Sequence, residues 1–200
     1  MLDFVGAIQE AKIGGAGLYA TLADHMPSVE ASLAVRGLAS DETEHAMRLE
    51  RVAGERQTPA RIGPLAALAC GVQDESWQSA LMTAFALDQA ATAALHAIAR
   101  RGEGTLAETA ATIVDEERAH QSLALAAFRS VAEGDTQSGR RLAAEMLVAR
   151  DWVKQVFPRH AALAELAAAG LLPADAAKVH DSFLASLGDR VQEALGVLGD

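Results

Sequence analysis

Two short stretches decide the fold of this 200-residue chain, VDEERAH at residues 114–120 and SDETEH at residues 40–45. In each stretch a glutamate is followed three residues later by a histidine. The two pairs are Glu117 with His120 and Glu42 with His45. Residues three apart on a helix share one face, with Cβ atoms about 5–6 Å apart, so both side chains of a pair can reach one ion. If both stretches are helical, they can form two halves of one metal site.

The composition of the chain favours helices. Alanine and leucine dominate, aromatic residues make up 4% of the sequence, and segments rich in the Val, Ile, Thr and Tyr typical of strands are missing. Two hundred residues with 50% apolar content suffice for one domain with a sizeable core. We therefore expect an all-α protein.

Charge and cysteine content argue against several classes of protein. The formal net charge of −10 argues against a nucleic-acid-binding surface, because phosphate contacts need clustered Lys and Arg. The single cysteine, Cys70, excludes an intrachain disulfide and fits a reducing cytoplasm. An acid within the first three residues and the lack of a long apolar run argue against a signal peptide and a membrane span. We expect a cytoplasmic protein.

Prolines, glycines and capping residues divide the chain into six expected helices. They cover about residues 3–25, 28–54, 74–101 and 105–132, then a fifth from GDTQSG at 134–139 to Pro158, and a sixth from Pro173 to about Val197. We expect one domain, residues 1–200, with a first helix hairpin (1–54), a connector (55–73), a second helix hairpin (74–133) and C-terminal helices (136–200).

The two hairpins can be tested for a shared site. In an antiparallel hairpin, two residues lie at the same height only if they are equidistant from the turn. Glu10 and Glu42 have their midpoint at residue 26, beside Pro27, and Asp88 and Glu117 have theirs in a Gly-Glu-Gly turn. The two lone acids therefore lie level with the two Glu-x-x-His motifs, as in four-helix bundles that bind a pair of metal ions.

Asp88 also stands out within its own helix, where it is the only ionisable residue between Glu75 and His96. The alternatives are a surface aspartate, a solvated Glu10 and two solvated Glu–His pairs. Burying such groups without partners costs on the order of several kcal/mol, and a bound metal removes that penalty. We interpret the set as the ligands of two metal ions: Glu10, Glu42, His45, Asp88, Glu117 and His120.

An acid precedes the glutamate of each motif, Asp41 before Glu42 and Glu116 before Glu117. Metal-bound imidazoles usually donate their second N–H to a carboxylate. We expect Asp41 and Glu116 to support the histidine of the opposite helix, the alternative being charges that face solvent.

Three segments resemble the phenylacetic acid catabolic family of the ferritin-like di-iron carboxylate proteins, which includes the oxygenase subunit of phenylacetyl-CoA epoxidase. They are LDQAATAAL around Asp88, IVDEERAHQSLA around Glu117, and the tail with RRLAAEMLVARDWVKQVFP and FLASLGDRVQEALGVLG. The resemblance implies a ferritin-like four-helix bundle of two antiparallel hairpins with two additional C-terminal helices. Because the family's partner subunit typically lacks a full ligand set, six ligands indicate the catalytic type.

The resemblance also implies a function. The six ligands would hold two Fe ions, with manganese as the alternative metal, since both ions accept this oxygen-rich set. The expected enzyme is a di-iron monooxygenase that uses O2 to hydroxylate or epoxidise a small organic substrate, for example an acyl thioester. A separate reductase would supply the electrons, and no catalytic residue beyond the metal ligands is expected.

Other functions stay open at this point. They are a rubrerythrin-like peroxide-reducing di-iron protein, a tRNA-modifying di-iron hydroxylase, and a non-enzymatic ferritin-like bundle. The acidic net charge counts against the tRNA enzyme. The sequence also leaves open whether the chain forms a homo-oligomer or a hetero-oligomer.

Overall fold

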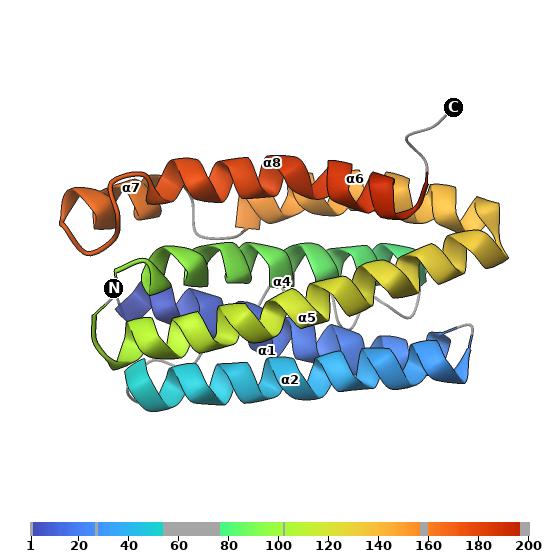
Figure 1. Ribbon diagram of the computed structural model, residues 1–200, viewed down its shortest axis with the longest axis horizontal. Coiled ribbons are helices and arrows are strands. Elements are labelled where there is room, and N and C mark those ends of the chain that lie inside the picture. Colours follow the sequence, from blue (N-terminus) through green and yellow to red (C-terminus); the bar gives the residue numbers. More distant parts are fainter. Residues whose placement is uncertain (1, 27, 54–76, 102, 157–159, 197–200) are drawn as a thin grey trace.

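The protein is helical throughout the part described by the structure, a computed structural model (Figure 1). The described residues are 2–26, 28–53, 77–101, 103–156 and 160–196. They form helices, turns and loops without a strand, which confirms the expected all-α class. The expected connector, residues 55–73, lies outside the described residues.

Four helices form the bundle that the Glu-x-x-His spacing predicts. α1 (Leu2–Leu22) and α2 (Val29–Ala53) make the first antiparallel hairpin, and α4 (Trp77–Ala99) and α5 (Thr105–Gly134) make the second. The short 3-10 helix η1 (Ala23–His25) lies in the turn of the first hairpin. α1 packs on α2 and α4, and α5 packs on the same two helices. Each helix therefore has two bundle neighbours and can direct one face to a common centre.

Three further helices follow, α6 (Thr136–Val156), α7 (His160–Ala168) and α8 (Ala176–Ala194). α6 and α8 lie side by side against α4, on the side of that helix away from α2 (Figure 1). They are the two additional C-terminal helices that the resemblance implies. The short α7, which packs on α8, was not among the expected helices.

α4 occupies the middle of the molecule because α1, α5, α6 and α8 all pack on it. A helix surrounded in this way must be apolar on every side, and 18 residues of α4 are buried. Within the described residues, α4 is also the helix long and apolar enough to cross a membrane, but 89% of its apolar window is buried inside the protein. Its composition is therefore explained by the core, and no membrane span is implied.

The start of α2 shows how the sequence sets the register of the first hairpin. Ser28 lies before the first helical residue, and its Oγ accepts a hydrogen bond of 3.1 Å from the backbone N–H of Ala31. This is the N-cap arrangement expected for serine at a helix start. It fixes where α2 begins, and with it the height of the Glu42 motif along the bundle.

Candidate metal centre

The two Glu-x-x-His motifs meet at the centre of the bundle. Glu42 and His45 lie in the middle of α2, and Glu117 and His120 lie in the middle of α5. Each of the four side chains offers a ligand atom, and these atoms all lie within 4.8 Å of one another. Glu42, His45 and Glu117 are at most 2% exposed, and the side chain of His120 is 17% exposed. The structure thus brings the two motifs together as one buried cluster.

One polar atom of each of these four residues lacks a hydrogen bond within the described part of the chain. The atoms are Glu42 Oε2, His45 Nδ1, Glu117 Oε2 and His120 Nδ1. His45 Nδ1 lies 2.8 Å from Glu117 Oε1 and His120 Nδ1 lies 3.5 Å from Glu117 Oε2, but neither contact has hydrogen-bond geometry. Buried donors and acceptors are rarely left unpaired. An ion between α2 and α5 would satisfy all four atoms.

The outer nitrogen of each imidazole faces an acid from the opposite helix. His45 Nε2 lies 2.9 Å from Glu116 Oε2, and His120 Nε2 lies 2.9 Å from Asp41 Oδ2. Each carboxylate favours a proton on Nε2, which leaves the lone pair of Nδ1 turned toward the cluster. The contacts are those that the sequence predicts for Asp41 and Glu116. Their role in orienting metal ligands is part of the proposal below.

Arg48 holds Glu116 in place. Its Nη1 donates to both carboxylate oxygens of Glu116 at 2.8 Å, and its Nη2 donates to Glu44 Oε1 at 2.6 Å. Burial would raise the pKa of Glu116, but Arg48 and His45 outweigh this effect and lower it. Sequence reasoning missed Arg48, although the four-residue spacing of Glu44 and Arg48 on α2 is a usable signal.

A lysine from α1 lies at the centre of the three buried carboxylates. The Lys12 side chain is fully buried, and its Nζ lies 2.5 Å from Asp88 Oδ1, 2.5 Å from Glu117 Oε1 and 3.0 Å from Glu42 Oε1. Three acceptors therefore surround the three N–H donors of one ammonium group. Asp88 also accepts a hydrogen bond of 3.3 Å at Oδ2 from Gln89 Nε2. Asp88 is thus brought to the site as expected, but its contacts are with Lys12 and Gln89.

The structure does not bring Glu10, the ligand expected from α1, into this cluster. Two residues along a helix correspond to about 200° of rotation, so Glu10 and Lys12 project from nearly opposite sides of α1. Glu10 is partly exposed and is not among the four clustered ligand residues. The midpoint of Lys12 and Glu42 is residue 27, so the predicted height was right to within one residue. Lys12 is the only basic residue of α1, which is the signal that could have identified it.

The cluster shifts the pKa values of its own members. Burial would lower the pKa of Lys12, but the carboxylates of Asp88, Glu42 and Glu117 outweigh it and raise the pKa well above its usual value. Burial would raise the pKa of Glu117, yet Lys12 and the two histidines hold it well below its usual range. Burial and neighbouring carboxylates raise the pKa values of Glu42 and Asp88. Burial would lower the pKa of His45, but Glu117 and Glu42 raise it to about 10.

These charges decide which metal complement fits the residues. When ionised, Glu42, Asp88 and Glu117 carry three negative charges and Lys12 carries one positive charge, so one divalent cation would make these four residues neutral overall, with both imidazoles neutral. Two divalent cations would give these four residues a net charge of +2 in the interior, which only the partly exposed acids Asp41 and Glu116 could offset, so the arrangement is unfavourable. By charge, these residues favour one metal ion between α2 and α5 over the expected pair of irons.

An apolar cavity and a surface groove lie along the same helices as the cluster. The cavity, of about 20 Å³, is lined by apolar side chains and Tyr19, and it includes Leu38 and Ala124. Leu38 lies one helical turn before Glu42 on α2, and Ala124 lies two turns after Glu117 on α5. Burial and the neighbouring carboxylates raise the pKa of Tyr19 well above its usual value, so its phenol stays protonated. The cavity thus extends along the bundle to within one or two turns of the cluster.

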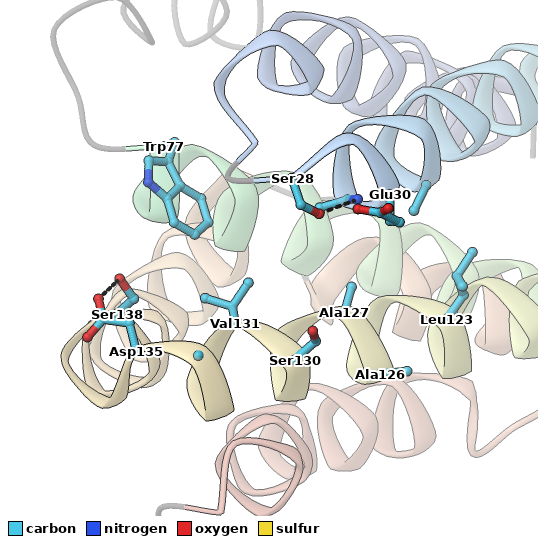
Figure 2. Close-up of a pocket in the computed structure, with 13 residues that line it drawn as sticks. Ser28, Glu30, Trp77, Leu123, Ala126, Ala127, Ser130, Val131, Asp135 and Ser138 are labelled. Atoms are coloured by element: carbon cyan, nitrogen blue, oxygen red, sulfur yellow. Dashed lines mark hydrogen bonds between the residues drawn. The ribbon is translucent and has the colours of Figure 1, made fainter.

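The groove of about 640 Å³ shares part of its lining with this cavity. Figure 2 shows Trp77 at one end of the groove, and Ser28 and Glu30 across from Ala127 and Ser130 of α5. The described lining residues include two acids, Glu30 and Asp135, and no base. The groove and the cavity together lead from the surface toward the cluster.

Comparison with known proteins agrees with this architecture. The family model of phenylacetic acid catabolic proteins matches residues 9–197, nearly the whole chain. No curated protein gives a significant match. The family implies the ferritin-like superfamily, and it supports an oxidoreductase role of the di-iron oxygenase type in phenylacetate catabolism. The chain belongs to the phenylacetic acid catabolic protein family.

Proposed function

We propose that this protein is a metal-dependent monooxygenase that uses O2 to hydroxylate or epoxidise a small organic substrate, with electrons from a separate reductase. The observation that carries the proposal is the set of four buried, unpaired donor atoms on Glu42, His45, Glu117 and His120. Two imidazole nitrogens and carboxylate oxygens are the donor set typical of non-haem Fe(II) oxygenases. Membership of the family supports the same class of reaction.

The residues of the cluster have distinct roles in this proposal. A bound iron ion supplies the electron exchange through which O2 becomes reactive toward an organic molecule. His45 and His120 would hold the ion through Nδ1, with the tautomer of each ring set by Glu116 and Asp41. Lys12 keeps its proton at Nζ beside the ligands, where its positive charge can stabilise negative charge on a reacting oxygen.

The groove and cavity suggest the kind of substrate. The cavity of about 20 Å³ has room for about one water molecule, so the space for a substrate is the groove, whose lining of Trp77, Leu123, Val131 and several alanines favours a hydrophobic or aromatic group. The two acids of the groove would repel a thioester that carries a nucleotide with several phosphates. We therefore favour an uncharged or weakly charged aromatic or aliphatic substrate over a coenzyme A thioester. The single cysteine fits a cytoplasmic location for such an enzyme.

A second candidate function is a non-catalytic, metal-free bundle that serves as a partner subunit. Lys12 favours it, because its ammonium group pairs with all three buried carboxylates without any metal. A peroxide-reducing enzyme would use the same cluster, and peroxide turnover without oxygen insertion would identify it. For the tRNA hydroxylase, the net charge of −10 is unfavourable, and tRNA binding that weakens with salt would support it.

The first experiment is metal loading followed by oxygen consumption. The purified protein is incubated with Fe(II) without air, passed through a desalting column, and mixed with oxygenated buffer in the presence of a chemical reductant. We expect bound iron and reductant-dependent O2 consumption, both abolished by Glu117→Ala. Glu108→Ala, at an exposed position of the same helix, is the matched control and should behave like the wild type. A wild-type protein that takes up no iron would refute the enzyme proposal and favour the partner subunit.

A further inference from the structure

We infer that this cluster binds one divalent metal ion per chain, and that the ammonium group of Lys12 occupies the place of a second ion. The inference rests on the proposed metal binding but goes beyond it, because it fixes the stoichiometry of the site and gives α1 a new role. It is carried by the geometry around Lys12 Nζ and by the unpaired atoms on the opposite side of the same carboxylates.

In each of the two motif glutamates, the two carboxylate oxygens have different surroundings. Glu42 and Glu117 both place Oε1 on Lys12 Nζ, at 3.0 and 2.5 Å, while their Oε2 atoms make no hydrogen bond within the described residues. Both Oε2 atoms are buried, as is the unpaired Nδ1 of His45. Each carboxylate can therefore bridge two cations, one on each side. The ammonium group of Lys12 is already one of them.

Lys12 lies where the first helix of a dinuclear bundle would contribute a carboxylate. It is level with Glu42 across the first hairpin, and it reaches residues of α2, α4 and α5 at once. A lysine at this position removes one negative charge and adds one positive charge. The site thereby loses two units of negative charge, which is the charge of one divalent ion.

The contacts of Asp88 also support a single metal ion. Its Oδ1 lies on Lys12 Nζ and its Oδ2 accepts from Gln89 Nε2, so both oxygens already have protein partners. The remaining ligand set consists of two imidazole nitrogens and two carboxylate oxygens, from His45, His120, Glu42 and Glu117. This set suits one first-row divalent ion such as Fe(II), Mn(II) or Zn(II).

The test uses Mn(II) as the probe, because both its amount and its coupling can be measured. The full-length protein is stripped with a chelator, equilibrated with Mn(II) by dialysis, and analysed for metal per chain and by electron paramagnetic resonance. We expect one Mn(II) per chain with the six-line signal of an isolated ion. Lys12→Glu should bind two ions per chain and show the multiline signal of a coupled pair. Glu10→Gln is the matched control on α1 and should still bind one ion.

Asp88→Asn provides a second variant if Lys12→Glu does not fold. We expect it to retain one ion per chain, whereas Glu117→Gln should lose it. Two ions per wild-type chain, or a folded Lys12→Glu protein that still binds one, would overturn the inference and leave the proposed function standing. One ion without reductant-dependent O2 consumption would refute the proposed function alone, and a wild type that binds no metal would overturn both.

Discussion

Replacing Lys12 by methionine should destabilise the metal-free protein strongly. Methionine keeps most of the apolar stem of lysine but removes the ammonium group, so the buried carboxylates of Glu42, Asp88 and Glu117 lose their shared partner. Removing one partner of a buried ion pair typically costs about 3–5 kcal/mol. In a domain of this size, 1 kcal/mol shifts the melting temperature by about 2–4 °C, so we expect a decrease of about 6–20 °C.

The loss should depend on pH and on metal. The pKa values of Glu42 and Asp88 are already raised, and without Lys12 they would rise further. A carboxyl group with a folded-state pKa above its unfolded value binds its proton more tightly in the folded protein, so stability increases as pH falls through the folded-state pKa. The deficit of Lys12→Met should therefore be larger at pH 8 than at pH 5. A bound divalent ion should restore part of the lost stability.

The assay is thermal and urea unfolding in the presence of a chelator, at pH 5 and pH 8, with and without added Mn(II). Lys178→Met, which removes an exposed lysine on α8, is the control and should leave stability nearly unchanged. A Lys12→Met protein that loses less than about 1 kcal/mol at pH 8, with the pH dependence of the wild type, would refute the view that Lys12 neutralises the cluster.

Three further outcomes are expected. Gly139→Ala should cost about 1–3 kcal/mol in urea unfolding, because the added Cβ would lie 2.7 Å from Ala132 Cβ and 3.0 Å from its Cα; unchanged stability would contradict this packing. In the metal-free protein, the raised pKa of His45 stabilises the folded state fully below about pH 6.5, and this stabilisation is lost as the pH rises toward 10. His45→Gln should therefore flatten the dependence of the free energy of unfolding on pH over this range. Arg48→Met should weaken metal binding about 10–100-fold in a chelator competition, since Glu116 loses its bidentate partner; unaltered affinity would show that Glu116 needs no such support.

Much of the fold follows from local signals in the sequence. The Ser28 cap and the spacing of glycines and prolines predict the two hairpins, and the two Glu-x-x-His motifs place their central faces together. The isolated position of Asp88 in an apolar helix correctly predicts its burial at the same centre. The short α7 was missed because its alanine-rich sequence lies between two prolines that were used as helix boundaries.

The residue contributed by α1 could not be chosen from height alone. Equidistance from the turn locates a level along the bundle to within about one residue, and Glu10 and Lys12 both satisfy it. The choice between them depends on the rotation of α1 about its own axis, which is set by packing on α2 and α4. The expectation of a carboxylate then favoured Glu10, although the lone lysine of this helix offered a signal as strong as that of Asp88.

The contacts of Lys12 also have a consequence for the order of folding. Its Nζ meets partners that are 30, 76 and 105 positions away in the chain, on three different helices. Contacts between residues so far apart in the chain form late in folding. The two hairpins must first form and pack together, and only then can these contacts offset the entropy lost in closing the long loops between the residues. Substitution of Lys12 should therefore speed unfolding much more than it slows folding. The ammonium group of Lys12 would therefore slow the unfolding of the assembled bundle as well as balance the charge of the cluster.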